Sequence, residues 1–227
     1  MGEIITHFEI DEEKLAILKP CMEHYGVGLD NDEWSHNIIS SQAVIYQNGV
    51  IAHRNLTVNH SVDSVELALC KTIAAEAESI MSGVEVGMGS ESSDTFHQFF
   101  IAAHTNEIIP NKIDESLIRS KFGGTIFPLA TITVEPLKES GIWWSEVEYD
   151  GSESSHEYFK PWKSMVEWFN NRVEFIDTAC IRIGDSKELL WLGLEKNILP
   201  GCVLPRLILG LTRKGSLVGL FGISVQT

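Results

Sequence analysis

The chain has 227 residues, of which 44% are hydrophobic, and it carries 32 carboxylates against 17 lysines and arginines, a formal net charge of −15 at pH 7. This length is sufficient for a full core, and the hydrophobic content excludes wholesale disorder. The negative charge disfavours contact with nucleic-acid phosphates and anionic membrane surfaces, and no apolar run reaches the roughly 20 residues that span a bilayer. We therefore expect a protein that binds neither nucleic acid nor membrane.

The cysteines and the first residues bear on the compartment and on cofactors. Cys21, Cys70, Cys180 and Cys202 are far apart and lack the C-x-x-C or Cys/His spacing of a structural zinc site. Residues 1–19 lack the basic and apolar segments of a secretory signal. We expect a cytoplasmic protein with reduced thiols, no metal and no other cofactor.

The distribution of sequence features favours a single unit. No internal repeat or clear linker occurs, so we predict one α+β domain over residues 1–227, with two closely packed halves that meet near 105–122 as the alternative. The charge is uneven, because residues 1–35 hold nine carboxylates whereas none follows Glu195. An acidic body and a basic tail can pair internally or present two different faces to a partner.

The first expected elements are a strand at 4–10, a helix at 11–19 and a hairpin over 42–58. The hairpin has the strongest signal, because Asn48-Gly49 supplies the positive φ angles of a type I′ turn. Counting outward from this turn pairs Tyr46 with Ile51 and Val44 with His53.

A long helix is expected over residues 63–83. Asp63 with Glu66 predicts a capping box at its start, and Gly83 is typical of a helix end. The apolar residues of the buried face recur at steps of three or four: Val65, Leu69, Ile73, Ala77 and Ile80.

The remaining elements are mostly strands. Residues 95–104 fit either a strand or a helix, and a helix over 161–171 begins with Pro161 in its first turn. The other predicted strands are 84–88, 125–135, 142–149, 173–184 and those of a final hairpin. Because hairpins dominate over strand-helix alternation, we predict an α+β fold: mainly antiparallel sheet or sheets, two or three helices packed on one side, and a C-terminal β-hairpin.

The final hairpin has glycines at 210, 219 and 222. A two-residue turn puts Gly210 opposite Gly219, with Phe221 leaning over the gap, whereas a three-residue loop with left-handed Gly215 puts Gly219 opposite Leu209. The stretch "GLTRKGSLVGLFGISVQT", with its G-x-T-x-x-G-x-L-x-G spacing, resembles the closing hairpin of the nuclease A inhibitor family. This resemblance covers residues 210–227 and implies an acidic inhibitor.

An aromatic and acidic stretch supplies the first candidate site. Strand alternation over 142–149 predicts Trp143, Ser145, Val147 and Tyr149 on the core face. The opposite face and the residues after it give the candidate binding set: Trp144, Glu146, Glu148, Asp150, Glu153 and Glu157. An exposed tryptophan among carboxylates is typical of an interface that docks a basic protein. The alternative is that Trp144 lies under the 161–171 helix and the glutamates only solvate an edge strand.

The second candidate site is a pocket between the sheet and the 63–82 helix. Its candidate residues are His53, Asp94, His97 and His104. The chain contains no phosphate-loop, dinucleotide, zinc-protease or nucleophile-elbow motif, so we identify no catalytic residues. Two functions follow: a non-enzymatic inhibitor, immunity or regulatory factor that docks a basic partner, and, as the alternative, a small-molecule-binding protein or hydrolase-type enzyme.

Overall fold

The computed structural model describes residues 38–40, 43–53, 61–90, 93–128, 130–151, 156–184 and 203–225. Within them the helices are α2 (Ser64–Ile80), α3 (Glu115–Lys121), α4 (Ile142–Asp150) and α5 (His156–Asn171). The strands are β1 (Ala43–Ile45), β2 (Ile51–His53), β3 (His97–Ile101), β4 (Ile132–Pro136), β5 (Phe175–Ile183), β6 (Val203–Thr212) and β7 (Leu217–Val225). The predicted strand at 4–10 and helix at 11–19 lie outside the described residues.

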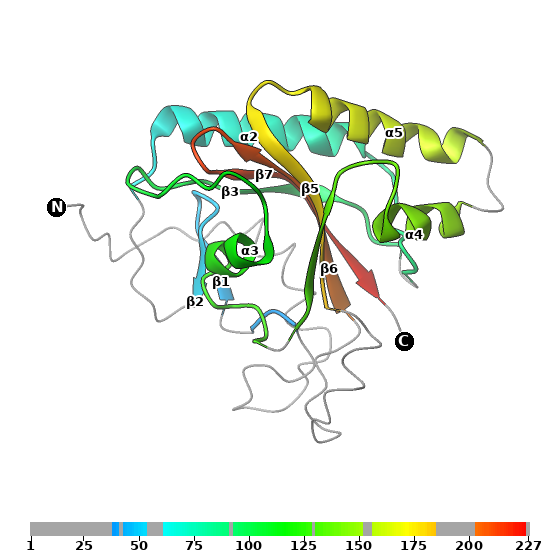
Figure 1. The fold of residues 1–227 in the computed structure, drawn as a ribbon, viewed down its shortest axis with the longest axis horizontal. Coiled ribbons are helices and arrows are strands. Elements are labelled where there is room, and N and C mark those ends of the chain that lie inside the picture. The colour runs from blue at the N-terminus through cyan, green and yellow to red at the C-terminus, as the bar shows by residue number, and fades with distance from the viewer. Residues whose placement is uncertain are drawn as a thin grey trace, which may run out of the picture.

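The strands form a five-stranded sheet in the order β3-β7-β6-β5-β4 and a separate β1-β2 pair (Figure 1). Every neighbouring pair is antiparallel, and β6 and β7 form the C-terminal hairpin. The predicted fold class is therefore confirmed. No helix in the described part of the chain is long and apolar enough to cross a membrane.

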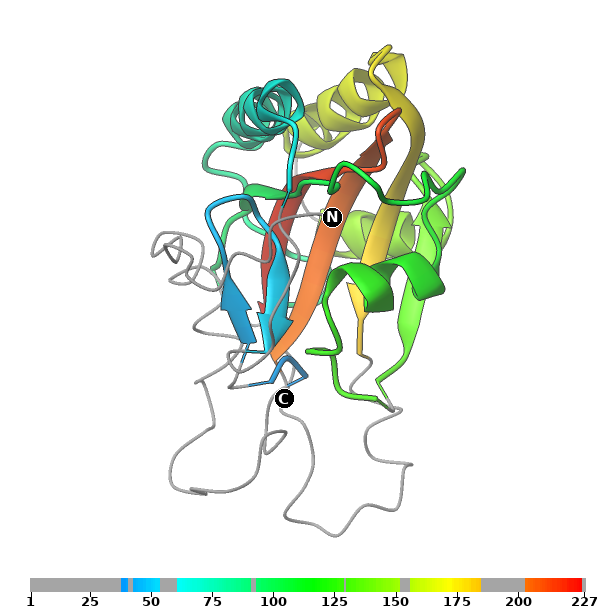
Figure 2. The same ribbon diagram turned by 90° about the vertical axis from the view of Figure 1, so that its left-hand side faces the viewer.

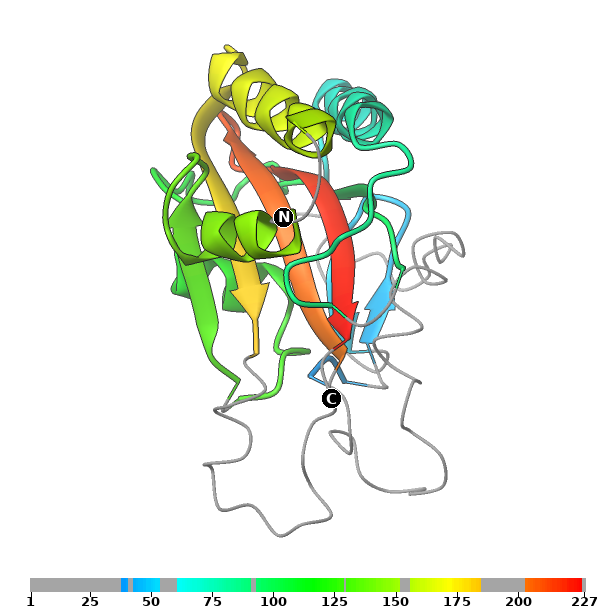
Figure 3. The ribbon, with the colours of Figure 1, turned by 90° about the vertical axis from the view of Figure 1, so that its right-hand side faces the viewer.

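The large sheet lies between two unequal layers. Helices α2, α5 and α4 cover one face, where their buried side chains form one cluster with Cys180, Ile208 and Leu220 of the sheet (Figure 3). The β1-β2 pair and α3 lie on the other face and pack with Leu207 and Phe221 (Figure 2). Because β6 and β7 are covered on both faces, their sequences are nearly continuous runs of apolar residues.

The loop of the final hairpin has the longer of the two predicted forms. Gly215 has φ +88° and its N–H donates to the carbonyl of Thr212, so the loop contains three residues and Gly219 lies opposite Leu209. The expected contact of Phe221 with the strand glycines is wrong. At Gly210 a Cβ atom would lie 2.4 Å from the ring of Phe175, so the missing side chain makes room for an aromatic ring of the next strand.

The β1-β2 register differs by one residue from the prediction. Ile45 lies opposite Ile51 and Ala43 opposite His53. The N–H of Gly49 donates to the carbonyl of Tyr46, and Gly49 has φ +78°. The connection is therefore a type I turn followed by a left-handed glycine, which adds one residue to the loop and shifts every pair.

Helix α2 begins as predicted, with the Asp63 carboxylate accepting hydrogen bonds from the N–H groups of Val65 and Glu66. The predicted reciprocal bond from the Glu66 side chain is replaced by contacts within the core. Val65 is 71% exposed, because the helix is rotated relative to the predicted face. The buried positions are Glu66, Cys70, Ile73, Ala74 and Ala77.

The prediction of a strand at 142–149 is wrong, because this segment is helix α4. Trp143 and Val147 share a face at a spacing of four in either conformation, so strand alternation and a helix turn could not be separated there. Helix α5 begins at His156, earlier than predicted, and Pro161 lies inside it. The ambiguous 95–104 segment contains strand β3, whereas 84–88 contributes only an isolated bridge between Glu85 and Thr95.

Candidate functional site

Helix α4 is fixed to the sheet by its apolar face. Trp143, Trp144 and Val147 are all buried, and the rings of the two tryptophans meet edge to face at 5.4 Å. The indole N–H of Trp144 donates to Glu148 Oε1 at 2.8 Å. Of the two interpretations of Trp144, the exposed one is wrong and the buried alternative is right: its ring lies in the core against Phe159 of the helix that includes residues 161–171, and only its polar edge reaches an acidic side chain.

The start of α4 is capped by a residue of the preceding strand and not by the N-cap residue itself. Gly141 has no side chain to cap the helix, and the Glu135 carboxylate at the end of β4 accepts hydrogen bonds from Ile142 N at 2.9 Å and Trp143 N at 3.2 Å. A carboxylate at a helix N-terminus satisfies free N–H groups and complements the helix dipole. Glu135 therefore sets where α4 begins.

Glu146 points toward the sheet. Its Oε1 atom accepts a hydrogen bond from Arg182 Nη1 of β5 at 2.8 Å, and the same guanidinium lies 3.4 Å from Glu135 Oε2. Burial raises the pKa of Glu146 above its usual value, against the opposing attraction of Arg182. Glu146 is therefore an internal anchor of α4.

The outer face of α4 carries two large apolar side chains. Ile142 is 58% exposed and Tyr149 is 77% exposed. Glu148 is exposed beside Tyr149, and Glu157 at the start of α5 is 81% exposed. We call Ile142, Glu148, Tyr149 and Glu157 the α4 surface.

The other two members of the predicted binding set differ from these. Asp150 Oδ2 accepts a hydrogen bond from Gly89 N at 3.2 Å, so it ties α4 to the loop before β3 that contains Gly87 and Gly89. Glu153 lies outside the described residues. Sequence reasoning missed Tyr149, because strand alternation assigned it to the core, whereas a helix with Trp143 and Val147 inward turns position 149 outward.

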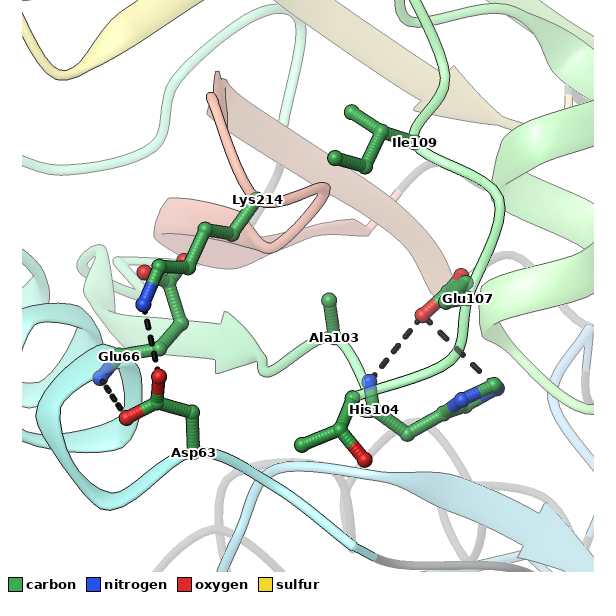
Figure 4. Close-up of a pocket in the computed structure, with 8 residues that line it drawn as sticks. Asp63, Glu66, Ala103, His104, Glu107, Ile109 and Lys214 are labelled. Carbon is green, nitrogen blue, oxygen red and sulfur yellow. Dashed lines mark hydrogen bonds and ion pairs between the residues drawn. The ribbon is translucent and has the colours of Figure 1, made fainter.

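A hollow of about 230 Å³ opens where the start of α2 faces the segment after β3 and the β6-β7 loop (Figure 4). The side chains around it include Asp63, Glu66, His104, Glu107 and Lys214. The alternative site was predicted between the sheet and the 63–82 helix, whereas this hollow is lined by the start of α2 and two loops and by no residue of the sheet strands. Of the four candidates, His53, Asp94, His97 and His104, only His104 lines it.

The charged groups of the hollow are already engaged with one another. Lys214 Nζ lies 2.8 Å from Asp63 Oδ2, and this hydrogen bond lowers the pKa of Asp63 and raises that of Lys214. Glu107 pairs with the buried ammonium of Lys121 and lies 4.0 Å from His104 Nε2. Glu66 Oε1 accepts hydrogen bonds from the Thr212 and Ser216 hydroxyls, each at 2.7 Å.

The other residues of the predicted pocket lie elsewhere. His53 on β2 contacts the Gly124 carbonyl through Nε2 at 3.0 Å, and His97 on β3 lies 3.6 Å from Glu78. Asp94 accepts a hydrogen bond from Val86 N through its backbone carbonyl. The structure therefore does not bring these three residues to the hollow.

Neither thiol that the structure describes is poised for chemistry. Cys70 and Cys180 are buried and form no disulfide with each other, and burial strongly raises the pKa of Cys180. Among the described residues, no group of three or more histidine, cysteine, aspartate or glutamate side chains could hold a metal ion.

Comparison with known proteins adds no relationship. No family model matches the chain, and no curated protein matches it.

Proposed function

We propose that this protein is a non-enzymatic binding factor that docks a basic partner protein through the α4 surface. The observation that carries the proposal is the exposure of Ile142 and Tyr149 on a helix whose other face is buried, with the exposed carboxylate of Glu148 next to Tyr149 in the chain. Glu157 at the start of α5 adds a second exposed carboxylate, which lies 3.7 Å from Lys160 Nζ. Tyrosine gives a large contact area at a low cost in side-chain entropy, and it is enriched at binding hot spots. Tyr149 takes the anchoring role that the sequence assigned to Trp144.

The acidic side chains of the α4 surface, Glu148 and Glu157, favour a cationic partner. Exposed charges contribute little to affinity individually, but together they steer association and select partners by sign. The Debye length is about 8 Å at physiological ionic strength, so this contribution weakens when salt is added. The helix is already fixed by Trp143 and Val147, so docking requires little ordering of the backbone.

The proposal is tested by affinity capture from an extract of the source organism with matched variants. Tyr149→Ala combined with Glu157→Lys changes the α4 surface, whereas Ile108→Ala combined with Glu115→Lys makes similar changes at exposed positions elsewhere. We expect a basic protein that the wild type and the control retain, that the α4 variant loses, and that elutes as salt rises. Equal retention by the wild type and the α4 variant would rule the surface out.

Small-molecule binding at the hollow is the second candidate function, because His104, Glu107 and Lys214 converge there. Its test is a screen of metabolites by NMR, with chemical shifts followed at these three residues. Shifts that saturate there, and that His104→Ala abolishes, would favour this function over protein docking.

A further inference from the structure

We propose that Arg182 is a positioning residue that sets the orientation of helix α4, and thereby the side chains that α4 presents to a partner. The inference rests on the proposed function in one respect, namely that α4 forms the docking surface. The way in which Arg182 holds the helix on the sheet does not depend on that function.

Arg182 connects α4 to the sheet at two points. Its guanidinium lies 2.8 Å from Glu146 Oε1 in the middle of the helix and 3.4 Å from Glu135 Oε2. Glu135 in turn accepts the hydrogen bonds of Ile142 N and Trp143 N at the first turn. One arginine therefore fixes both the cap and a side chain one turn further along.

The apolar contacts of α4 do not fix its rotation to the same degree. Trp143, Trp144 and Val147 give a broad apolar face, and its packing contacts are non-directional; the directional contact of this face with the sheet is a long hydrogen bond from Trp143 Nε1 to the Pro136 carbonyl at 3.4 Å. Because an α-helix turns by about 100° per residue, a slip of one position would replace Tyr149 on the outer face. Hydrogen bonds between a guanidinium and carboxylates are directional, so they distinguish between such arrangements.

The ion pair of Arg182 with Glu146 is poorly suited to stabilise the fold. The side chains of Arg182 and Glu146 are 12% and 25% exposed, so both charges are largely withdrawn from water. Arg182 Nε and Glu146 Oε2 are buried and have no hydrogen-bond partner among the described residues. Burial of an imperfectly satisfied ion pair costs about as much as it returns, and such pairs can instead specify one conformation.

The test compares an apolar replacement of the pair with the loss of a single partner. The double variant Arg182→Met with Glu146→Leu removes both buried charges, and Glu135 keeps its two backbone donors in α4. Arg182→Met alone removes the hydrogen-bond donor of Glu146 and leaves its carboxylate with the attraction of Arg206 only, and Arg182→Lys keeps the charge without the planar fork. Hydrogen exchange read by mass spectrometry reports the protection of residues 142–150 separately from that of β6 and β7.

We expect the double variant to keep the thermal midpoint of the wild type within a few degrees, while the α4 amides exchange about tenfold faster, the change that one charge-assisted hydrogen bond accounts for. Protection in β6 and β7 stays unchanged. In Arg182→Lys, the protection of the α4 amides falls between that of the wild type and that of the double variant. Wild-type protection of α4 in the double variant overturns the inference, and so does a double variant that fails to fold, because either result assigns the pair no positioning role. If α4 loses protection but partner capture is unaffected, Arg182 still positions the helix and the α4 surface is not the docking site.

Discussion

Replacing Glu66 by alanine is expected to destabilise the protein by about 3 kcal/mol, because two buried hydroxyls would lose their acceptor and each such loss costs about 1–3 kcal/mol. Glu66, Thr212 and Ser216 are 4%, 2% and 0% exposed. The two hydroxyl oxygens already accept backbone N–H groups, from Lys214 and Ser216 at Thr212 and from Ala103 at Ser216. The two hydroxyl protons are donated to Glu66 Oε1, so they lose their acceptor when the carboxylate is removed.

The assay for this prediction is thermal and urea denaturation of matched variants. In a protein of this size, 3 kcal/mol corresponds to a fall in the midpoint of about 6–12 °C. Glu66→Gln, which keeps an oxygen at the acceptor position, should lose less than half as much. Glu157→Ala, at a side chain that is 81% exposed, should stay within about 0.5 kcal/mol of the wild type. If Glu66→Ala unfolds with the midpoint of Glu157→Ala, the network does not hold the hairpin loop.

Two further predictions concern buried positions. The folded-state pKa of Glu146 lies above its usual value of 4.5, so its contribution to stability is present below pH 4.5 and is lost as the pH rises through the folded pKa. The stability of Glu146→Gln relative to wild type, measured by urea denaturation, should therefore increase with pH above 4.5; a flat difference would contradict this. Gly219→Ala should destabilise by about 1–3 kcal/mol or more, because its Cβ would lie 2.0 Å from the Ile208 carbonyl oxygen. Gly83→Ala, where the added Cβ meets no atom within 4 Å, is the control for φ strain alone, and equal losses in the two variants would refute the packing argument.

Local signals predicted the antiparallel class and most strands of the sheet, but they left residues 95–104, which contain β3, open between strand and helix, and they gave the wrong element for α4. The apolar periodicities and glycine turns predicted the antiparallel fold and both hairpins, because these features depend on neighbours in the chain. Helix α4 depends on a cap from Glu135 and a partner in Arg182, which neither alternation nor propensity records. Tyr149 is exposed because the segment is a helix. The prediction of a strand at 142–149 therefore also selected Trp144 in place of Tyr149 as the exposed aromatic residue.

The other two differences depend on contacts with residues that are distant in the sequence or on packing. Glu66 has the spacing of a capping box, yet its carboxylate bonds to Thr212 and Ser216 near the other end of the chain. At Asn48-Gly49 a type I turn followed by a left-handed glycine replaces the predicted type I′ turn, and both loops accept the same residues. The register therefore depends on packing that the sequence pattern does not contain.

The most direct test of the account is site-specific photo-cross-linking with benzoylphenylalanine at position 149 and, as the control, at position 108, which is 91% exposed in the wild type. Both proteins would be irradiated in an extract of the source organism at low and high salt. We expect one discrete adduct with a basic protein from position 149, lost at high salt, and none from position 108. The same adducts from both positions, or none from position 149, would contradict docking through the α4 surface.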